Sequence, residues 1–163
     1  MIATILTFSA CNTINEDLPT YEETSIVSVG DIAPDFTTTL LNGGSVTLSE
    51  LRDEVVMLVF FSHTCPDCKA LLDDIVAAKS DFEAAQVKVL AISRGGQESE
   101  IREYVATNNY NFDVAVDDTK EIYNLYATMY VPRTYLIDRT GIVVHTTIEY
   151  AKSHVADLLV AAN

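Results

Sequence analysis

Residues 55–76 read VVMLVFFSHTCPDCKALLDDIV, and this stretch decides the fold. Its first seven residues are all apolar, which is typical of a central strand that is buried on both faces. From Cys65 onward, apolar residues recur at steps of three and four. This period predicts a helix with Cys68 on its buried face and Cys65 in its exposed first turn. Pro66 fits that turn, where its missing N–H breaks no helical hydrogen bond.

A pair of cysteines at a strand-to-helix junction points to thiol chemistry. Two thiols three residues apart can close a small, reversible disulfide, and the unpaired N–H groups of a helix N-terminus favour the thiolate form of Cys65. Only the thiolate attacks a disulfide, so the spacing indicates thiol–disulfide exchange. Zinc sites also use Cys-x-x-Cys, with His63 and His145 as further candidate ligands. No second cysteine pair exists, and we expect neither a metal nor a cofactor.

Chain length and net charge limit the number of domains and the classes of binding partner. A chain of 163 residues forms about one domain and buries a sizeable core without disulfide staples. Its formal net charge of −14 argues against nucleic acid and against an anionic membrane surface as partners, because both need clusters of Lys and Arg. No segment reaches the roughly 18 apolar residues that span a bilayer.

The N-terminus has its own pattern. Residues 2–11 (IATILTFSAC) are uncharged and end in small residues before Cys11, which resembles the end of a bacterial lipoprotein signal peptide. That resemblance implies that residues 1–11 are a signal remnant with Cys11 as the lipidated residue. The protein would then be an extracytoplasmic, membrane-anchored lipoprotein facing the periplasm, held by its lipid alone. The alternative is an apolar terminus with an incidental cysteine. Residues 12–29 are polar and acidic and predict a flexible tether.

Residues 30–163 have the periodicity of one α/β domain. A hairpin is expected around the turn at 42–44 and a buried strand at 87–92. A helix at 98–108, a strand at 112–116 and a short helix at 120–125 follow. A second hairpin turns at 138–141, and a helix over 151–161 ends the chain. Parallel βαβ units with an antiparallel hairpin at one edge predict a mixed sheet covered on both faces.

Three further stretches carry a family resemblance. A strand, Cys-x-x-Cys, a helix and a late Val-Pro before a hairpin form the layout of the thioredoxin fold. The opening GDIAPDF (30–36), the turn LNGGS (41–45) and VPRTYLIDRTG (131–141) resemble the TlpA/ResA-like thiol–disulfide oxidoreductases of the redoxin (AhpC-TSA) family. The resemblance implies a thioredoxin-like α/β fold with a mixed central sheet, helices on both faces and an added N-terminal β-hairpin.

The resemblance also assigns roles. Cys65 would be the attacking thiol, Cys68 the resolving thiol, and Pro132 a cis-proline facing them. The residues expected to contact substrate are Thr64, Pro66 and Val131, the last through its backbone. The implied substrate is a disulfide in an exported protein, and the implied electron donor is a membrane-bound dithiol protein.

The chain departs from the family around the cysteines. Thr64 stands where a Trp is usual, and Val59 and Leu71 stand where relatives place an acid. The group that takes the proton from Cys68 therefore stays unassigned. Asp67, between the two thiols, carries a charge that opposes thiolate formation.

A peroxiredoxin is the main enzymatic alternative, and a redox-inert or metal-binding thioredoxin-fold module is the second. Peroxiredoxins carry Pro-x-x-x-Thr-x-x-Cys around the reactive cysteine and an arginine that polarises the peroxide. Aligned on Cys65, the Thr position is Ser62, which keeps a hydroxyl, but the Pro position is Leu58. Arg94 and Arg133 are candidates for the arginine, although a surface ion pair is the simpler expectation for each.

Overall fold

A computed structural model describes residues 18–162 of the chain. It opens with an N-terminal hairpin of two short strands, β1 (Thr37–Thr39) and β2 (Ser45–Thr47), followed by the 3-10 turn η1 (Leu48–Leu51). Strands and helices then alternate. The remaining elements are β3 (Val55–Phe61), α1 (Pro66–Ala77), α2 (Lys79–Ala84), β4 (Val87–Arg94), α3 (Glu98–Thr107), β5 (Asp113–Asp117), α4 (Tyr123–Tyr126), β6 (Arg133–Ile137), β7 (Val143–Ile148) and α5 (His154–Ala161).

The five longer strands form one mixed sheet in the order β5-β4-β3-β6-β7. β3 pairs in parallel with β4, and β4 with β5, whereas β6 runs antiparallel to both β3 and β7. All seven residues of β3 are buried, as the unbroken apolar run predicts. The predicted mixed sheet with an antiparallel hairpin at one edge is confirmed.

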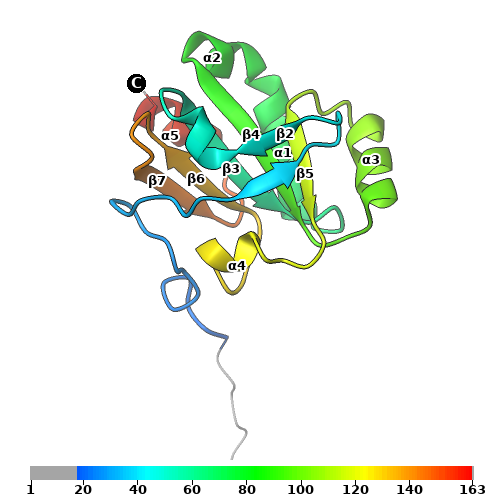
Figure 1. The fold of residues 1–163 in the computed structure, drawn as a ribbon, viewed down its shortest axis with the longest axis horizontal. Coiled ribbons are helices and arrows are strands. Elements are labelled where there is room, and N and C mark those ends of the chain that lie inside the picture. Colours follow the sequence, from blue (N-terminus) through cyan, green and yellow to red (C-terminus); the bar gives the residue numbers. More distant parts are fainter. Residues whose placement is uncertain (1–17, 163) are drawn as a thin grey trace, which may run out of the picture.

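The side chains of β3 alternate between two cores, because successive residues of a strand point to opposite faces of the sheet. Met57, Val59 and Phe61 lie in a core with Cys68 and with residues of α1, α2, α3 and α5; we call this side the α1 face. Leu58 and Phe60 lie in a second core that the N-terminal hairpin, η1 and α4 cover; we call this side the hairpin face. Figure 1 shows the hairpin crossing in front of the sheet, with α1 behind it.

Helix α1 begins where the periodicity predicts. Cys65 is its N-cap, with extended backbone, and Pro66 is its first residue, where the fixed φ of proline suits a helix start. The buried positions of the helix are those of the predicted apolar stripe, Cys68, Leu71, Leu72 and Ile75. The helix ends after three turns at Ala78, and α2 starts directly behind it, a break that the sequence pattern does not predict.

Residues 18–29 pack against the domain, whereas the sequence predicts 12–29 as a flexible tether. The side chain of Val27 is buried in the core of the hairpin face, and Thr24 is buried beside it. The backbone N–H groups of Ile26 and Val27 both donate to the carbonyl of Tyr126. The packed unit therefore begins before residue 30, and we call residues 19–28 the strap. Residues 12–17 and the predicted signal remnant with Cys11 lie outside the described residues.

None of the helices within residues 18–162 combines the length and the apolar composition that crossing a bilayer requires.

Candidate active site

The two cysteines of residues 65–68 occupy different environments. Cys65 is half-exposed at the N-cap of α1, and its sulfur accepts a hydrogen bond from the Cys68 N–H, with 3.3 Å between nitrogen and sulfur. Cys68 is fully buried, and its sulfur accepts from the Ser62 N–H at 3.4 Å. Both cysteines are free thiols in this structure. One thiol thus faces solvent at a helix N-terminus, and the other lies behind it in the α1 face.

Burial dominates the electrostatic environment of the Cys68 thiol. It raises the pKa of the Cys68 thiol, and the hydrogen bond with Cys65 raises it further, while the Ser62 N–H acts in the opposite direction. The charge of Asp67 adds a small further rise in the pKa of Cys68, the direction that the sequence predicts for this residue. Cys68 therefore holds its proton at neutral pH, whereas Cys65 is the thiol that a substrate can reach at the helix N-terminus.

The peptide bond between Val131 and Pro132 is cis, which confirms the prediction for this proline. It directly precedes β6, whose pairing with β3 carries it to the end of the sheet where the cysteines lie. The thiol of Cys65 donates to the Val131 carbonyl, with 3.7 Å between sulfur and oxygen. The structure thus brings together four predicted site residues, Cys65, Cys68, Val131 and Pro132. Thr64 and Pro66, the two residues that flank Cys65, are exposed, and their contact with substrate stays a prediction.

An aromatic layer of His63, Tyr104 and Tyr110 lies beside the thiols. His63 is half-buried against Tyr104, with 6.2 Å between the ring centres. Tyr104 in turn packs edge-on against Tyr110, whose hydroxyl donates to Asp73 of α1 at 3.0 Å. Helical spacing places Tyr104 inward on α3, but no sequence signal links it to Tyr110. His63 is therefore held by packing against Tyr104.

Both candidate arginines lie on the face opposite Cys68. Arg133 pairs in register with Phe60 of the hairpin face, and its side chain is only 1% exposed. The guanidinium carbon of Arg94 lies 4.4 Å from the ring centre of Tyr123, also in the hairpin face. The expectation of surface ion pairs is wrong for Arg133, because its partners are neutral oxygens inside the protein. Neither arginine lies where it would polarise a peroxide at Cys65.

Within residues 18–162, no group of three or more His, Cys, Asp and Glu side chains is placed to hold a metal ion. His145, the most distant ligand candidate, sits on β7, where it pairs with Leu136 of β6.

Comparison with known proteins assigns the family. The model of the AhpC/TSA family matches residues 29–146. The chain belongs to the AhpC/TSA family. Among curated members, the thiol-disulfide oxidoreductase ResA of Geobacillus kaustophilus is 28% identical over 121 residues, 74% of this chain and 70% of that protein. ResA of Bacillus subtilis is 27% identical over 118 residues, 72% of this chain and 66% of that protein. This AhpC/TSA member is thus similar to ResA over about three quarters of its length.

Solved structures confirm the thioredoxin-like fold. A Bacteroides thetaiotaomicron protein, provisionally assigned as a protein disulfide isomerase, is 31% identical with a TM-score of 0.77, covering 83% of this chain and 88% of that one. Peroxidoxin BcpB of Mycobacterium tuberculosis has a TM-score of 0.72 at 16% identity, covering 82% of this chain and 95% of that one, a likeness of fold alone. With the ResA relatives and the Cys65–Cys68 pair, the protein is a thiol–disulfide oxidoreductase.

Proposed function

We propose that this oxidoreductase reduces disulfides of exported proteins, with Cys65 as the attacking thiol and Cys68 as the resolving thiol. One observation carries the proposal: the half-exposed Cys65 sulfur sits at a helix N-cap, 3.7 Å from the Val131 carbonyl, with the protonated Cys68 behind it. The position of the Val131 backbone beside the nucleophile suits an extended substrate segment, which pairs through main-chain hydrogen bonds.

The reaction proceeds in two exchanges. The Cys65 thiolate attacks one sulfur of the substrate disulfide, forms a mixed disulfide and releases the other substrate sulfur as a thiolate. Cys68 then loses its proton and attacks the Cys65 sulfur, which closes the Cys65–Cys68 disulfide and releases the second substrate thiolate. Two electrons have passed to the substrate. A dithiol protein, which we propose to be membrane-bound, reduces the enzyme pair again by the same chemistry in reverse.

The proposed site of action is outside the cytoplasm, at the periplasmic side of a membrane. Its support is the lipoprotein-like stretch before Cys11 and the resemblance to the extracytoplasmic TlpA/ResA-like group. Lipid on Cys11 would then be the only membrane attachment. A single acyl chain binds a bilayer marginally, and several chains anchor it firmly.

The catalytic roles are tested with three cysteine variants in a disulfide-reduction assay with insulin or a disulfide-bonded peptide. We expect Cys65→Ser to abolish turnover and Cys68→Ser to accumulate a mixed disulfide that is visible on a non-reducing gel. Cys11→Ser is the matched control and should keep wild-type turnover. Equal turnover in all four proteins would refute the assignment of Cys65 and Cys68.

The anchor is tested separately. When the protein is expressed with a complete export signal, it should partition into detergent and incorporate labelled fatty acid, and Cys11→Ala should lose both properties. A wild-type protein that stays in the aqueous phase without label would refute lipidation while leaving the thiol chemistry intact.

A further inference from the structure

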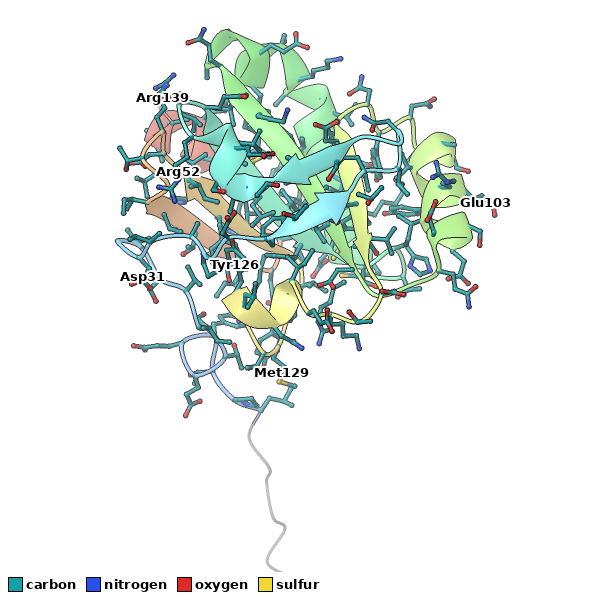
Figure 2. The ribbon with its side chains drawn as sticks, viewed as in Figure 1. Asp31, Arg52, Glu103, Tyr126, Met129 and Arg139 are labelled. Atoms are coloured by element: carbon teal, nitrogen blue, oxygen red, sulfur yellow. The ribbon has the colours of Figure 1, made fainter. Side chains whose placement is uncertain are left out.

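The strap, besides placing Val27 in the core of the hairpin face, binds the stretch that leads into the cis-proline. Ser25 forms an antiparallel bridge with Ala127, and the Thr128 N–H donates to the carbonyl of Thr24 at 2.9 Å. Figure 2 shows Met129 at the end of the molecule where the strap enters, well away from the labelled Glu103 of α3. Two segments that are about a hundred residues apart in sequence are therefore joined by main-chain hydrogen bonds.

Arg133 links the strap to this stretch from inside the protein. Its guanidinium donates to the hydroxyl of Thr24 at 2.6 Å, to the hydroxyl of Ser25 at 2.8 Å and to the Met129 carbonyl at 2.8 Å. A buried charge is costly unless its hydrogen bonds are satisfied, so these three acceptors must stay in place for Arg133 to remain buried. Two acceptors belong to the strap, and the third belongs to the stretch before the cis-proline.

Tyr130 makes a second link, next to the site itself. Its backbone is left-handed (φ +69°), a conformation that a bulky residue adopts only where its surroundings hold it. The Tyr130 hydroxyl donates to the Pro19 carbonyl at 2.7 Å, and its ring packs edge-on against Tyr21 with 5.0 Å between ring centres. The following residue is Val131, whose carbonyl faces Cys65.

We propose that the strap is a part of the oxidoreductase site: by holding Tyr130 and Arg133, it fixes the position of the Val131 backbone opposite Cys65. Thr24, Tyr130 and Arg133 are then positioning residues for the substrate disulfide. This inference rests on the proposed function. The chemistry depends on such placement, because displacing a substrate-positioning group by about 1 Å is enough to slow a reaction strongly.

Thr24 gives a clean test of this role. Thr24→Val keeps the shape and removes the hydroxyl that accepts from Arg133, whereas Thr24→Ser keeps the hydroxyl. We expect Thr24→Val to raise the KM for a disulfide-bonded peptide about threefold to tenfold, the range of one lost hydrogen bond. Thr24→Ser should stay near the wild-type KM. The rate of Cys65 alkylation by iodoacetamide should change far less than the KM, because the N-cap position of Cys65 and its bond from the Cys68 N–H do not involve the strap.

A pair of tyrosine variants separates positioning from stability. Tyr130→Phe removes the bond to Pro19, and Tyr126→Phe removes an equivalent bond at 2.6 Å to the carbonyl of Pro34, outside the strap. Both should lower the melting temperature, but only Tyr130→Phe should raise the peptide KM. Amide hydrogen exchange at residues 128–131 should quicken in Thr24→Val and Tyr130→Phe and not in Tyr126→Phe.

The inference would be overturned if Thr24→Val and Tyr130→Phe kept the wild-type peptide KM and the wild-type rate of amide hydrogen exchange. It would also be overturned if the peptide KM changed in step with the melting temperature in all variants. A wild-type protein that fails to reduce the peptide would instead refute the proposed function, and the catalytic role of the strap with it.

Discussion

The buried thiol of Cys68 makes the stability of the reduced protein depend on alkaline pH. Burial raises the pKa of this thiol in the folded state, whereas an exposed thiol in the unfolded chain titrates near pH ~8.5. Above that pH the unfolded chain has lost a proton that the folded protein keeps. The contribution of Cys68 to folding is therefore fully present below the unfolded pKa and is lost as pH rises toward the folded pKa.

The size of this pH effect follows from a difference of one bound proton between the folded and the unfolded protein. With one proton fewer bound in the unfolded state, the free energy of unfolding falls by about 1.4 kcal/mol per pH unit. Between pH ~9.5 and ~11 the loss amounts to about 2 kcal/mol from Cys68 alone. Burial also raises the pKa of Tyr110 and Tyr126, which adds a loss of the same sign above pH ~10.

The measurement compares the reduced wild type with Cys68→Ala by urea unfolding at a series of pH values from 7 to 11, with a non-thiol reductant present. The tyrosines contribute equally to both proteins, so the difference between the two unfolding free energies isolates Cys68. We expect a constant difference below pH ~8 and a change of about 1.4 kcal/mol per pH unit above pH ~9.5. Parallel curves over the whole range would show that Cys68 titrates as an exposed thiol, which would refute its buried, protonated state.

Three other predictions concern the core, a turn and the peroxide alternative. Leu71→Ala on the buried side of α1 should lower the free energy of urea unfolding by about 2–5 kcal/mol, and a loss below 1 kcal/mol would contradict its burial. Gly141→Ala should lower the free energy of unfolding by more than about 1 kcal/mol in the same assay, because φ is +87° at this position and the new Cβ would lie 2.6 Å from the Arg52 guanidinium. An unchanged free energy of unfolding would refute this prediction. Hydrogen peroxide should oxidise the reduced protein at the rate of an ordinary thiol, since Arg133 faces away from Cys65, and fast turnover with a dithiol would favour a peroxidase.

The central part of the fold could be read from the sequence because its signals are local. The unbroken apolar run of β3 and the helical step after Cys65 depend on neighbouring residues only, and both elements have the predicted place. The hairpin turns carry their own glycine and aspartate signals. Element ends were less certain: the short helix expected at 120–125 covers only Tyr123–Tyr126, because the chain first turns through a left-handed Lys120.

The strap could not be predicted, because its binding depends on partners far away in sequence. Residues 19–28 show no apolar period, and most of their contacts are backbone bonds and two hydroxyls that meet Arg133 more than a hundred residues later. Arg133 itself reads as a surface residue from composition alone. A buried cation with neutral acceptors leaves no pattern along the chain, so only the folded arrangement shows it.

The alternating side-chain directions at the start of β6 limit the insertions and deletions that this sequence can accept in evolution. Pro132 lies at the site, and the next residue, Arg133, points into the opposite core. Successive side chains of a strand point to opposite faces of the sheet. The loss or gain of one residue between Met129 and Arg133 would therefore turn the Arg133 side chain from the hairpin face to the face with the thiols. The length of this stretch is therefore fixed, and insertions that lengthen the protein must accumulate elsewhere.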